Sequence, residues 1–328
     1  MKNYIYFILA LIILMTSCEQ NSYSPNGIIV NNSVNSSVNL FEEAISNRTQ
    51  TLVFPANTGT VCKFSDEGVQ ICLETDCFLL NGEPVASGDI ILEYIEIFDK
   101  GDMVVTNKAT TDAGTGEMLI SGGEFYVQAY MNGSELSIST NCDWAGLLNI
   151  DPNLTGGIDW EMDMWMGDIN EDGNLNWSPV IDPNFGDTIN VVNCSFQDEV
   201  CQYTLPFLWG WHNCDVFYSW PSPKTTVTVN IPSEYDGSNS QVFILYDAED
   251  GGVAYFNYGG ANFFQSYDST IPVGMDAHIL FVLAYGNGSF SYAIESLTIE
   301  AGQVITFSSM DLETATESEM VDLINLLP

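Results

Sequence analysis

The chain has 328 residues, of which 46% are hydrophobic and 12% aromatic, so it holds enough apolar surface for packed cores and is not wholly disordered. It carries 44 acidic residues against 6 basic ones, and a formal net charge of −38 repels phosphates, which argues against DNA or RNA as a partner. Two histidines and a scarcity of arginine leave few options for metalloprotease, kinase or nucleotide chemistry.

The first predicted element is a lipoprotein signal peptide over residues 1–17. Lys2 supplies a short positive region, and the apolar run from Tyr4 to Met15 is too short to span a bilayer. The ending Leu14-Met15-Thr16-Ser17-Cys18 resembles a bacterial lipobox, which implies that Cys18 is lipidated and anchors the protein to a membrane. The alternative is an ordinary secretory signal that is cleaved nearby. Glu19 after the anchor favours the outer membrane by the same resemblance, with the protein facing the periplasm or the outside.

Residues 18–39 are rich in Asn and Ser and show no apolar period, which predicts a flexible tether. Beyond it, short alternating runs bounded by Gly, Asn and Asp predict an all-β protein with two β-sandwich (Ig-like) domains. We place an N-terminal sandwich at 40–142, a Trp-rich β segment at 143–220 and a C-terminal sandwich at 221–328. The middle segment holds all seven Trp residues, and we expect it to pack with the second sandwich.

Two helices are predicted beside these strands. One is short, around 40–46, and the other closes the chain, around 314–326. Thr314 and Glu317 have the spacing of a capping box, and Met320, Leu323 and Ile324 fall on one face of the second helix.

Several stretches resemble a known family. They are NGEPVASGDIILEYIEIFDKGDMVVTNKATT with the following GEMLISGGEFYVQAYMNGSEL, then KTTVTVNIPSEYDGSNSQVFILYD and the ending TATESEMVDLINLLP. They look like β modules of Bacteroidetes-type outer-membrane and surface lipoproteins of unknown function. The resemblance implies a cell-envelope lipoprotein and supplies no catalytic residues.

The cysteines predict disulfides, which are permitted outside the cytoplasm. Ser65 to Val69 reads as a three-residue hairpin loop with Gly68 in the left-handed position, and counting outward places Cys62 opposite Cys72. Cys194 and Cys201 could close a second short loop. Cys77 with Cys142 is a further candidate pair, and Cys214 is then a buried structural thiol.

One turn matches the opening of a calcium loop, with Asp168, Asn170, Asp172 and Asn174 at alternate positions around Gly173. Closely spaced oxygens suit Ca²⁺, but the twelfth position is Pro179 rather than Glu, so the loop is not an EF-hand. The alternative is a hairpin whose Asp-Gly turn needs these residues for its backbone.

The Trp-rich segment gives a second functional hypothesis. Trp209, Trp211 and Trp220 with Tyr218 could form a platform for a polysaccharide, although aromatic rings more often fill a β core. With 44 acids, some carboxylate pair always exists, so the sequence identifies no glycosidase. We therefore expect a non-enzymatic binding, adhesion or structural role with a protein or polysaccharide ligand. A carbohydrate-binding protein, or a glycan-processing enzyme, is the alternative.

Overall fold

The computed structural model describes residues 41–328 except 143–145, 156, 158–160, 182–187, 189–192, 196–199, 206–208, 221–222, 250 and 286, with the backbone alone at 193–195, 200–201 and 203–205. The predicted signal peptide, Cys18 and the tether lie outside the described residues. Among the residues described, no helix has the length and apolar character to cross a membrane.

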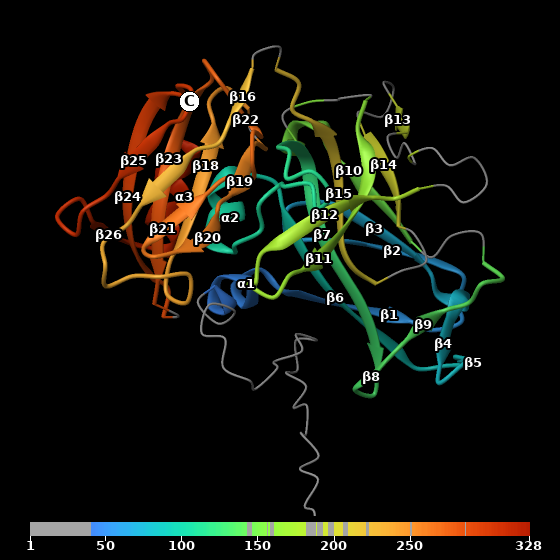
Figure 1. Cartoon of the computed structure of the whole chain (residues 1–328). Helices are drawn as coiled ribbons and strands as arrows, with labels where there is room; N and C mark the ends of the chain where they lie inside the picture. Colours follow the sequence, from blue (N-terminus) through green and yellow to red (C-terminus); the bar gives the residue numbers. More distant parts are fainter. Residues whose placement is uncertain are drawn as a thin grey trace, which may run out of the picture. The chain divides into compact units, whose positions relative to one another are not determined.

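The described chain is all-β, as the alternating runs predict (Figure 1). A first core lies between two sheets: Leu92 and Phe125 point into it from one sheet, and Ile71 and Leu148 from the other. The larger sheet has the strand order β1 (Gln50–Pro55), β6 (Asp89–Ile97), β7 (Leu119–Met131), β15 (Gly210–Phe217), β11 (Asp163–Ile169) and β12 (Leu175–Pro179), with β8 (Ser134–Glu135) paired to β7. The facing sheet has the order β13 (Asn193–Ser195), β14 (Val200–Leu205), β10 (Gly146–Ile150), β3 (Gln70–Glu74) and β2 (Thr60–Phe64). A small sheet consists of β5 (Glu83–Pro84), β4 (Phe78–Leu80) and β9 (Ser137–Ile138).

A second core forms in the C-terminal part of the chain. Val229 and Phe264 enter it from one sheet, and Val242 and Ile279 enter it from another. The first of these sheets is β20 (Asn257–Gly260), β21 (Phe263–Gln265), β17 (Thr228–Asn230) and β25 (Val304–Thr306). The second is β19 (Val253–Tyr255), β18 (Gln241–Tyr246), β23 (Asp276–Ala284), β24 (Ser289–Thr298) and β26 (Glu313–Thr316). A separate pair is formed by β16 (Lys224–Thr225) and β22 (Ile271–Pro272).

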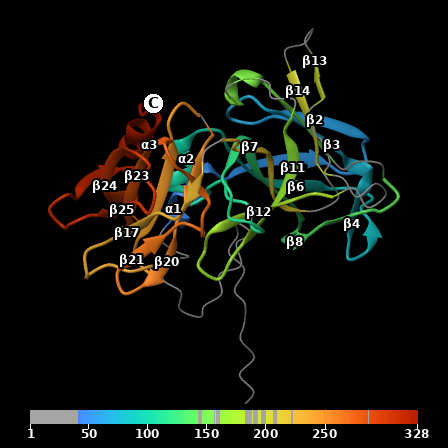
Figure 2. The ribbon, with the colours of Figure 1, turned by 45° about the horizontal axis from the view of Figure 1, so that its top comes forward.

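Within the described residues, three α-helices accompany the sheets: α1 (Glu42–Arg48), α2 (Lys100–Val105) and α3 (Glu317–Asn325). They lie together (Figure 2), because Arg48 at the end of α1 reaches both other helices and α3 packs mainly against α2. The approach of α2 to α3 depends on Gly101, where a Cβ atom would stand 2.7 Å from the carbonyl oxygen of Val321. Helix α2 was not predicted from the sequence. It is only six residues long, and its N-cap is Asp99, whose side chain accepts a hydrogen bond from Asp102 N.

Two expectations about the chain's organisation are wrong. The Trp-rich segment joins the first core rather than the second, because β15 pairs with β7 and β10 pairs with β3. The capping box also lies two residues later than expected. Thr316 and Glu319 form it, since Thr314 is still in β26, where it pairs with Ser291.

The local hairpin predictions are confirmed. The loop after Phe64 closes through Ser65 N and Val69 O at 2.9 Å, with Gly68 at φ +92°. The resulting register pairs Cys62 with Cys72, and the two form a disulfide. A second disulfide joins Cys77 and Cys142.

Candidate functional site

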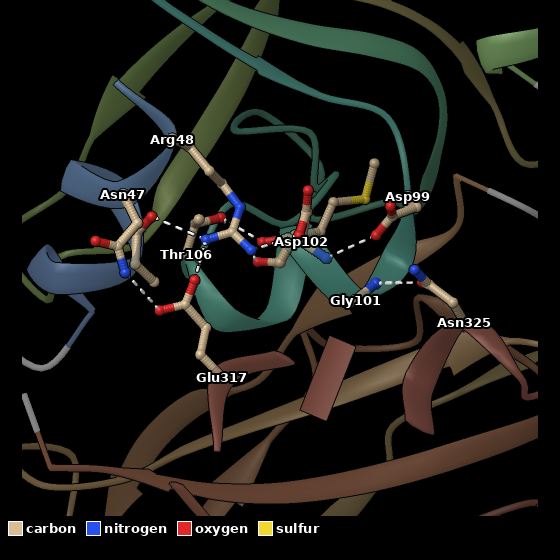
Figure 3. A network of polar contacts seen from close by, with 10 residues as sticks. Asn47, Arg48, Asp99, Gly101, Asp102, Thr106, Glu317 and Asn325 are labelled. Atoms are coloured by element: carbon tan, nitrogen blue, oxygen red, sulfur yellow. Dashed lines mark hydrogen bonds and ion pairs between the residues drawn. The ribbon is translucent and has the colours of Figure 1, made fainter. Parts of the chain in front are cut away.

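The few cations of this chain are concentrated where the two cores meet. We call this contact the seam: α1, α2 and the following residues to Ser121 on one side, and residues 224–328 on the other. Arg48 lies in it, 84% buried at its side chain, with Nη2 2.5 Å from Asp102 Oδ1 and Nη1 2.6 Å from Glu317 Oε1 (Figure 3). Figure 3 also shows Asn47 bonded to Glu317, so the last turn of α1 is fixed to the start of α3.

Two lysines also bind across the seam. The Lys100 ammonium donates to the carbonyl oxygens of Tyr246 and Pro328, at 3.1 Å each. Lys224, on the other side, forms an ion pair with Glu117. Backbone bonds run between these contacts, from Thr110 N to Val253 O at 2.7 Å and from Ser121 N to Gly251 O at 3.1 Å. The seam therefore consists of specific polar contacts.

A fourth cation, Lys108, is buried near Glu124, which in turn lies near Asp215. Its ammonium donates to Thr106 O at 3.2 Å and lies 5.3 Å from the ring centroid of Trp211. Burial lowers the pKa of Lys108 to about 8, an effect that the nearby Glu124 opposes in part. Burial also raises the pKa of Glu124, which Asp215 raises further, and burial raises the pKa of Asp215 itself. These three groups are enclosed in protein, and burial disfavours the charged form of each.

The same sheet carries a more accessible group of side chains further from the seam. In β7, Phe125, Val127 and Ala129 point into the first core, so Tyr126, Gln128 and Tyr130 point to the opposite face. The strand register then places neighbours beside them in three rows. The rows are Val53, Ile91, Tyr130 and Glu135; Thr51, Glu93 and Gln128; and Ile95, Tyr126 and Trp211. We call these residues the Tyr126 face.

Glu93 is the unusual group of the Tyr126 face. Only 6% of the residue is exposed, and burial raises its pKa to about 7, with a smaller opposing effect of Tyr130. Glu93 Oε2 and the Tyr130 hydroxyl are close but make no hydrogen bond of satisfactory geometry with any described residue. The rings of Tyr126 and Trp211 lie 5.4 Å apart between centroids. Burial raises the pKa of Tyr126 to about 12, so this phenol stays neutral. The Tyr130 hydroxyl approaches both Glu93 and Tyr126, so the polar atoms of the face lie against one another. The face is exposed along Thr51 and Val53.

The aromatic platform predicted from the sequence is not assembled as one surface. Trp209 stacks on Phe78 at 5.8 Å and packs against the first core. Trp220 stacks on Tyr218 at 6.0 Å, and Tyr218 packs against the second core. Trp211 alone joins the Tyr126 face. The alternation of residues 124–130 was the signal that could have identified Tyr126, Gln128 and Tyr130, but the partners Glu93 and Trp211 depend on sheet order.

The predicted calcium residues lie in the hairpin between β11 and β12. Asn170 Oδ1 accepts hydrogen bonds from the backbone N–H groups of Asp172 and Asn174, at 3.0 and 2.9 Å. The Asn174 side chain is buried and accepts from Asn107 and Gln241. Asp168 and Asp172 are exposed. No group of three or more His, Cys, Asp or Glu side chains arranged for a metal is found within the described ranges. The backbone of the turn thus accounts for the Asn170 side chain and for the Asn174 carbonyl oxygen, which accepts from Asn170 N, while Asn107 and Gln241 account for the Asn174 side chain. Calcium binding stays a prediction.

Cys214 and both histidines have structural surroundings, whereas the side chains of Cys194 and Cys201 lie outside the described residues. The β13–β14 register sets Cys194 directly opposite Cys201. Cys214 is a buried thiol of the first core. His278 Nδ1 lies 2.7 Å from Asp247 Oδ1, and His212 is buried opposite Phe125 in the sheet.

Comparison with known proteins does not assign the chain to a family. No protein-family model matches the chain, and no curated protein matches it significantly.

Proposed function

We propose that this protein is a non-enzymatic binding protein of the cell envelope, held at the outer membrane by a lipid on Cys18. The observation that carries the binding role is the Tyr126 face, where aromatic rings, an amide and a carboxyl share one partly exposed face of a sheet. Binding faces commonly combine such rings with a few polar groups that fix orientation. The outer-membrane location rests on the lipobox-like sequence that ends at Cys18.

The neighbours of Glu93 favour binding over glycoside hydrolysis, which needs two carboxyl groups placed on either side of the scissile bond. The direct cross-strand neighbours of Glu93 are Thr51 and Gln128 rather than an acid. Glu135, the other acid of the face, pairs with Tyr130, two residues further along β7.

Two measurements test the proposal. Metabolic labelling with a fatty acid should mark the wild type and not Cys18→Ala, which should also leave the membrane fraction. Incubation of the intact protein with envelope polysaccharides and peptides should yield bound complexes and no shortened products. Turnover that disappears in Glu93→Gln would show an enzyme instead, and unaltered labelling of Cys18→Ala would refute the anchor.

A further inference from the structure

The disulfide between Cys62 and Cys72 lies on the outer face of the facing sheet, away from the first core. In β3, Ile71 and Leu73 point into that core, so Cys72 points the other way. Its partner Cys62 is exposed on β2, the last strand of the sheet. We propose that this disulfide is an exchange site, at which a small thiol reversibly reduces the bond by attack on Cys62.

The open edge of β2 determines which sulfur is attacked. A thiolate displaces one sulfur of a disulfide by approaching the other in line with the S–S bond. Approach to Cys62 therefore comes from the side of β2 that faces away from β3, and among the described strands none pairs with that side. Approach to Cys72 would come from β10, where Leu147 is its direct neighbour. Cys62 thus takes the incoming thiol, and Cys72 is the leaving group.

A side chain beside Cys72 stabilises the leaving thiolate. Asn149 Nδ2 donates a long hydrogen bond, 4.0 Å, to Cys72 Sγ and a second bond, 2.9 Å, to Gln70 Oε1. The bond to sulfur strengthens when the sulfur becomes negatively charged, because charge-assisted hydrogen bonds are stronger than neutral ones. A thiolate that is better stabilised leaves faster. Asn149 therefore promotes reduction without itself reacting.

The exchange consumes two molecules of thiol. The first, as a thiolate, attacks Cys62 Sγ, the S–S bond breaks, and Cys72 leaves as a thiolate. The second attacks the sulfur that was added to Cys62, releases Cys62 as a thiolate and departs as the oxidised small disulfide. The protein bond gains two electrons, which the two thiols lose, and the protons that the thiols release are taken up by the two cysteines.

The hairpin stays in place when the bond is broken. Glu96 accepts hydrogen bonds from Ser65 Oγ at 2.8 Å and from Glu67 N at 3.0 Å, so the turn between β2 and β3 is held to β6. Cys62 and Cys72 are only 10 residues apart in the chain, and the stabilisation that a disulfide gives falls as its loop becomes shorter. Reduction therefore loosens β2 locally and leaves the sandwich folded, which makes the exchange reversible.

The charge of the protein selects the class of thiol. The net charge is −38, and Glu74 lies on the same outer face as the disulfide, two residues from Cys72. Lys63, the cation of β2, is on the opposite face, over the Phe54 ring. An anionic thiol is repelled from such a surface, so the thiol that reacts is neutral or cationic.

The test uses the intact oxidised protein in detergent, without air, and 2-mercaptoethanol, cysteamine or glutathione as the thiol. Acid quenching, alkylation and peptide mapping follow each cysteine. Cys62 and Cys72 should be reduced at least about tenfold faster than Cys77 and Cys142, because Cys77 is only 3% exposed. Early samples should carry the added thiol on Cys62. At equal thiolate concentration, cysteamine should react fastest and glutathione slowest, with a difference that shrinks in high salt.

Two variants test the leaving group. Asn149→Ala should slow the reduction of the Cys62–Cys72 bond by about two- to tenfold, the effect of one hydrogen bond. Gln70→Ala is the matched control, because it removes the other acceptor of the same amide and leaves the bond to sulfur, so it should react as the wild type does. Thermal unfolding confirms that each variant is folded at the assay temperature.

Each outcome decides one part of the proposal. Equal rates for the two disulfides, or reduction only in denaturant, would overturn the exchange site. Added thiol on Cys72 in place of Cys62 would overturn the argument from the open edge. An Asn149→Ala protein that reacts as fast as Gln70→Ala would remove the role of Asn149, and a faster reaction with glutathione than with cysteamine would refute the selection by charge. None of these results bears on the binding function proposed above.

Discussion

Arg48 gives the sharpest test of how the two cores are held together. Substitution by Gln keeps a polar side chain but shortens it and removes its charge. It leaves Asp102 and Glu317 close together in the seam without the cation that separates them. Breaking a buried ion pair costs about 3–5 kcal/mol. The two acidic side chains are 24% and 17% exposed, so water compensates in part, and we expect Arg48→Gln to lower the free energy of unfolding by about 2–4 kcal/mol.

The control for this experiment is Lys63→Gln, which changes the net charge by the same amount outside the seam. Denaturant unfolding of the oxidised proteins should show a loss below about 1 kcal/mol for this variant. Adding Asp102→Asn to Arg48→Gln should recover part of the stability, because one of the two opposed charges is then gone. If Arg48→Gln loses no more stability than Lys63→Gln, the ion pairs do not hold the cores together and the seam argument is wrong.

Three further predictions concern the buried acid, the remaining disulfide and the calcium turn. Burial raises the folded-state pKa of Glu124 above its unfolded value, so its stabilising contribution is full below about pH 4.3 and is lost as the pH rises toward the folded-state pKa. Glu124→Gln should therefore flatten the decline of stability with rising pH in denaturant titrations. An unchanged pH slope in the variant would contradict the assignment. Non-reducing peptide mapping should recover Cys194 linked to Cys201, because the strand register sets these two residues opposite each other. If both cysteines can be alkylated before reduction, they are free thiols and the predicted disulfide is wrong. With Asn170 and Asn174 engaged in the turn, any calcium held by Asp168 and Asp172 should bind weakly, with a Kd on the order of 10⁻³ M. Calcium should then raise the melting temperature of the wild type more than magnesium does. The double variant Asp168→Asn with Asp172→Asn should lose this difference between the two ions.

The predictions that succeeded depend on short-range geometry. A turn fixes the pairing of the few residues on either side of it, so Gly68 and the count from Ser65 are enough to place Cys62 opposite Cys72. The Asn132-Gly133 turn between β7 and β8 follows the same rule, with both residues at positive φ. Alternation in residues 124–130 likewise determines which side chains share a face.

The predictions that failed depend on which distant strands pair. The residues of β15 do not indicate that it pairs with β7, which lies more than eighty positions earlier in the chain. A β-bulge between Asn213 and Asp215 also shifts the register, so counting residues from one end does not give the pairing at the other. The six residues of α2 are too few to show a helical period, and its stability comes from contact with α3 at Gly101. The cap at Thr316 was misplaced because two threonines at that end of the chain could each serve as an N-cap, and the pairing of β26 with β24 decides between them.

Strand β7 connects the two unusual groups of this molecule, because both lie on its face opposite the first core. At the seam end, Glu124 is sealed in protein beside Lys108 and Asp215, where its neutral form is the stable one. Two residues further on, Tyr126 begins the partly exposed face, and Gln128 and Tyr130 continue it away from the seam. The contacts between the cores therefore fix the strand whose far half presents the binding residues. A rigid strand held at one end in this way keeps Tyr126 and Tyr130 in fixed positions, so little conformational entropy is lost when a ligand binds. By this argument Arg48→Gln should loosen the seam at α1 and α3 yet leave ligand affinity unchanged in molecules that remain folded, since β7 keeps its pairing with β6 and β15.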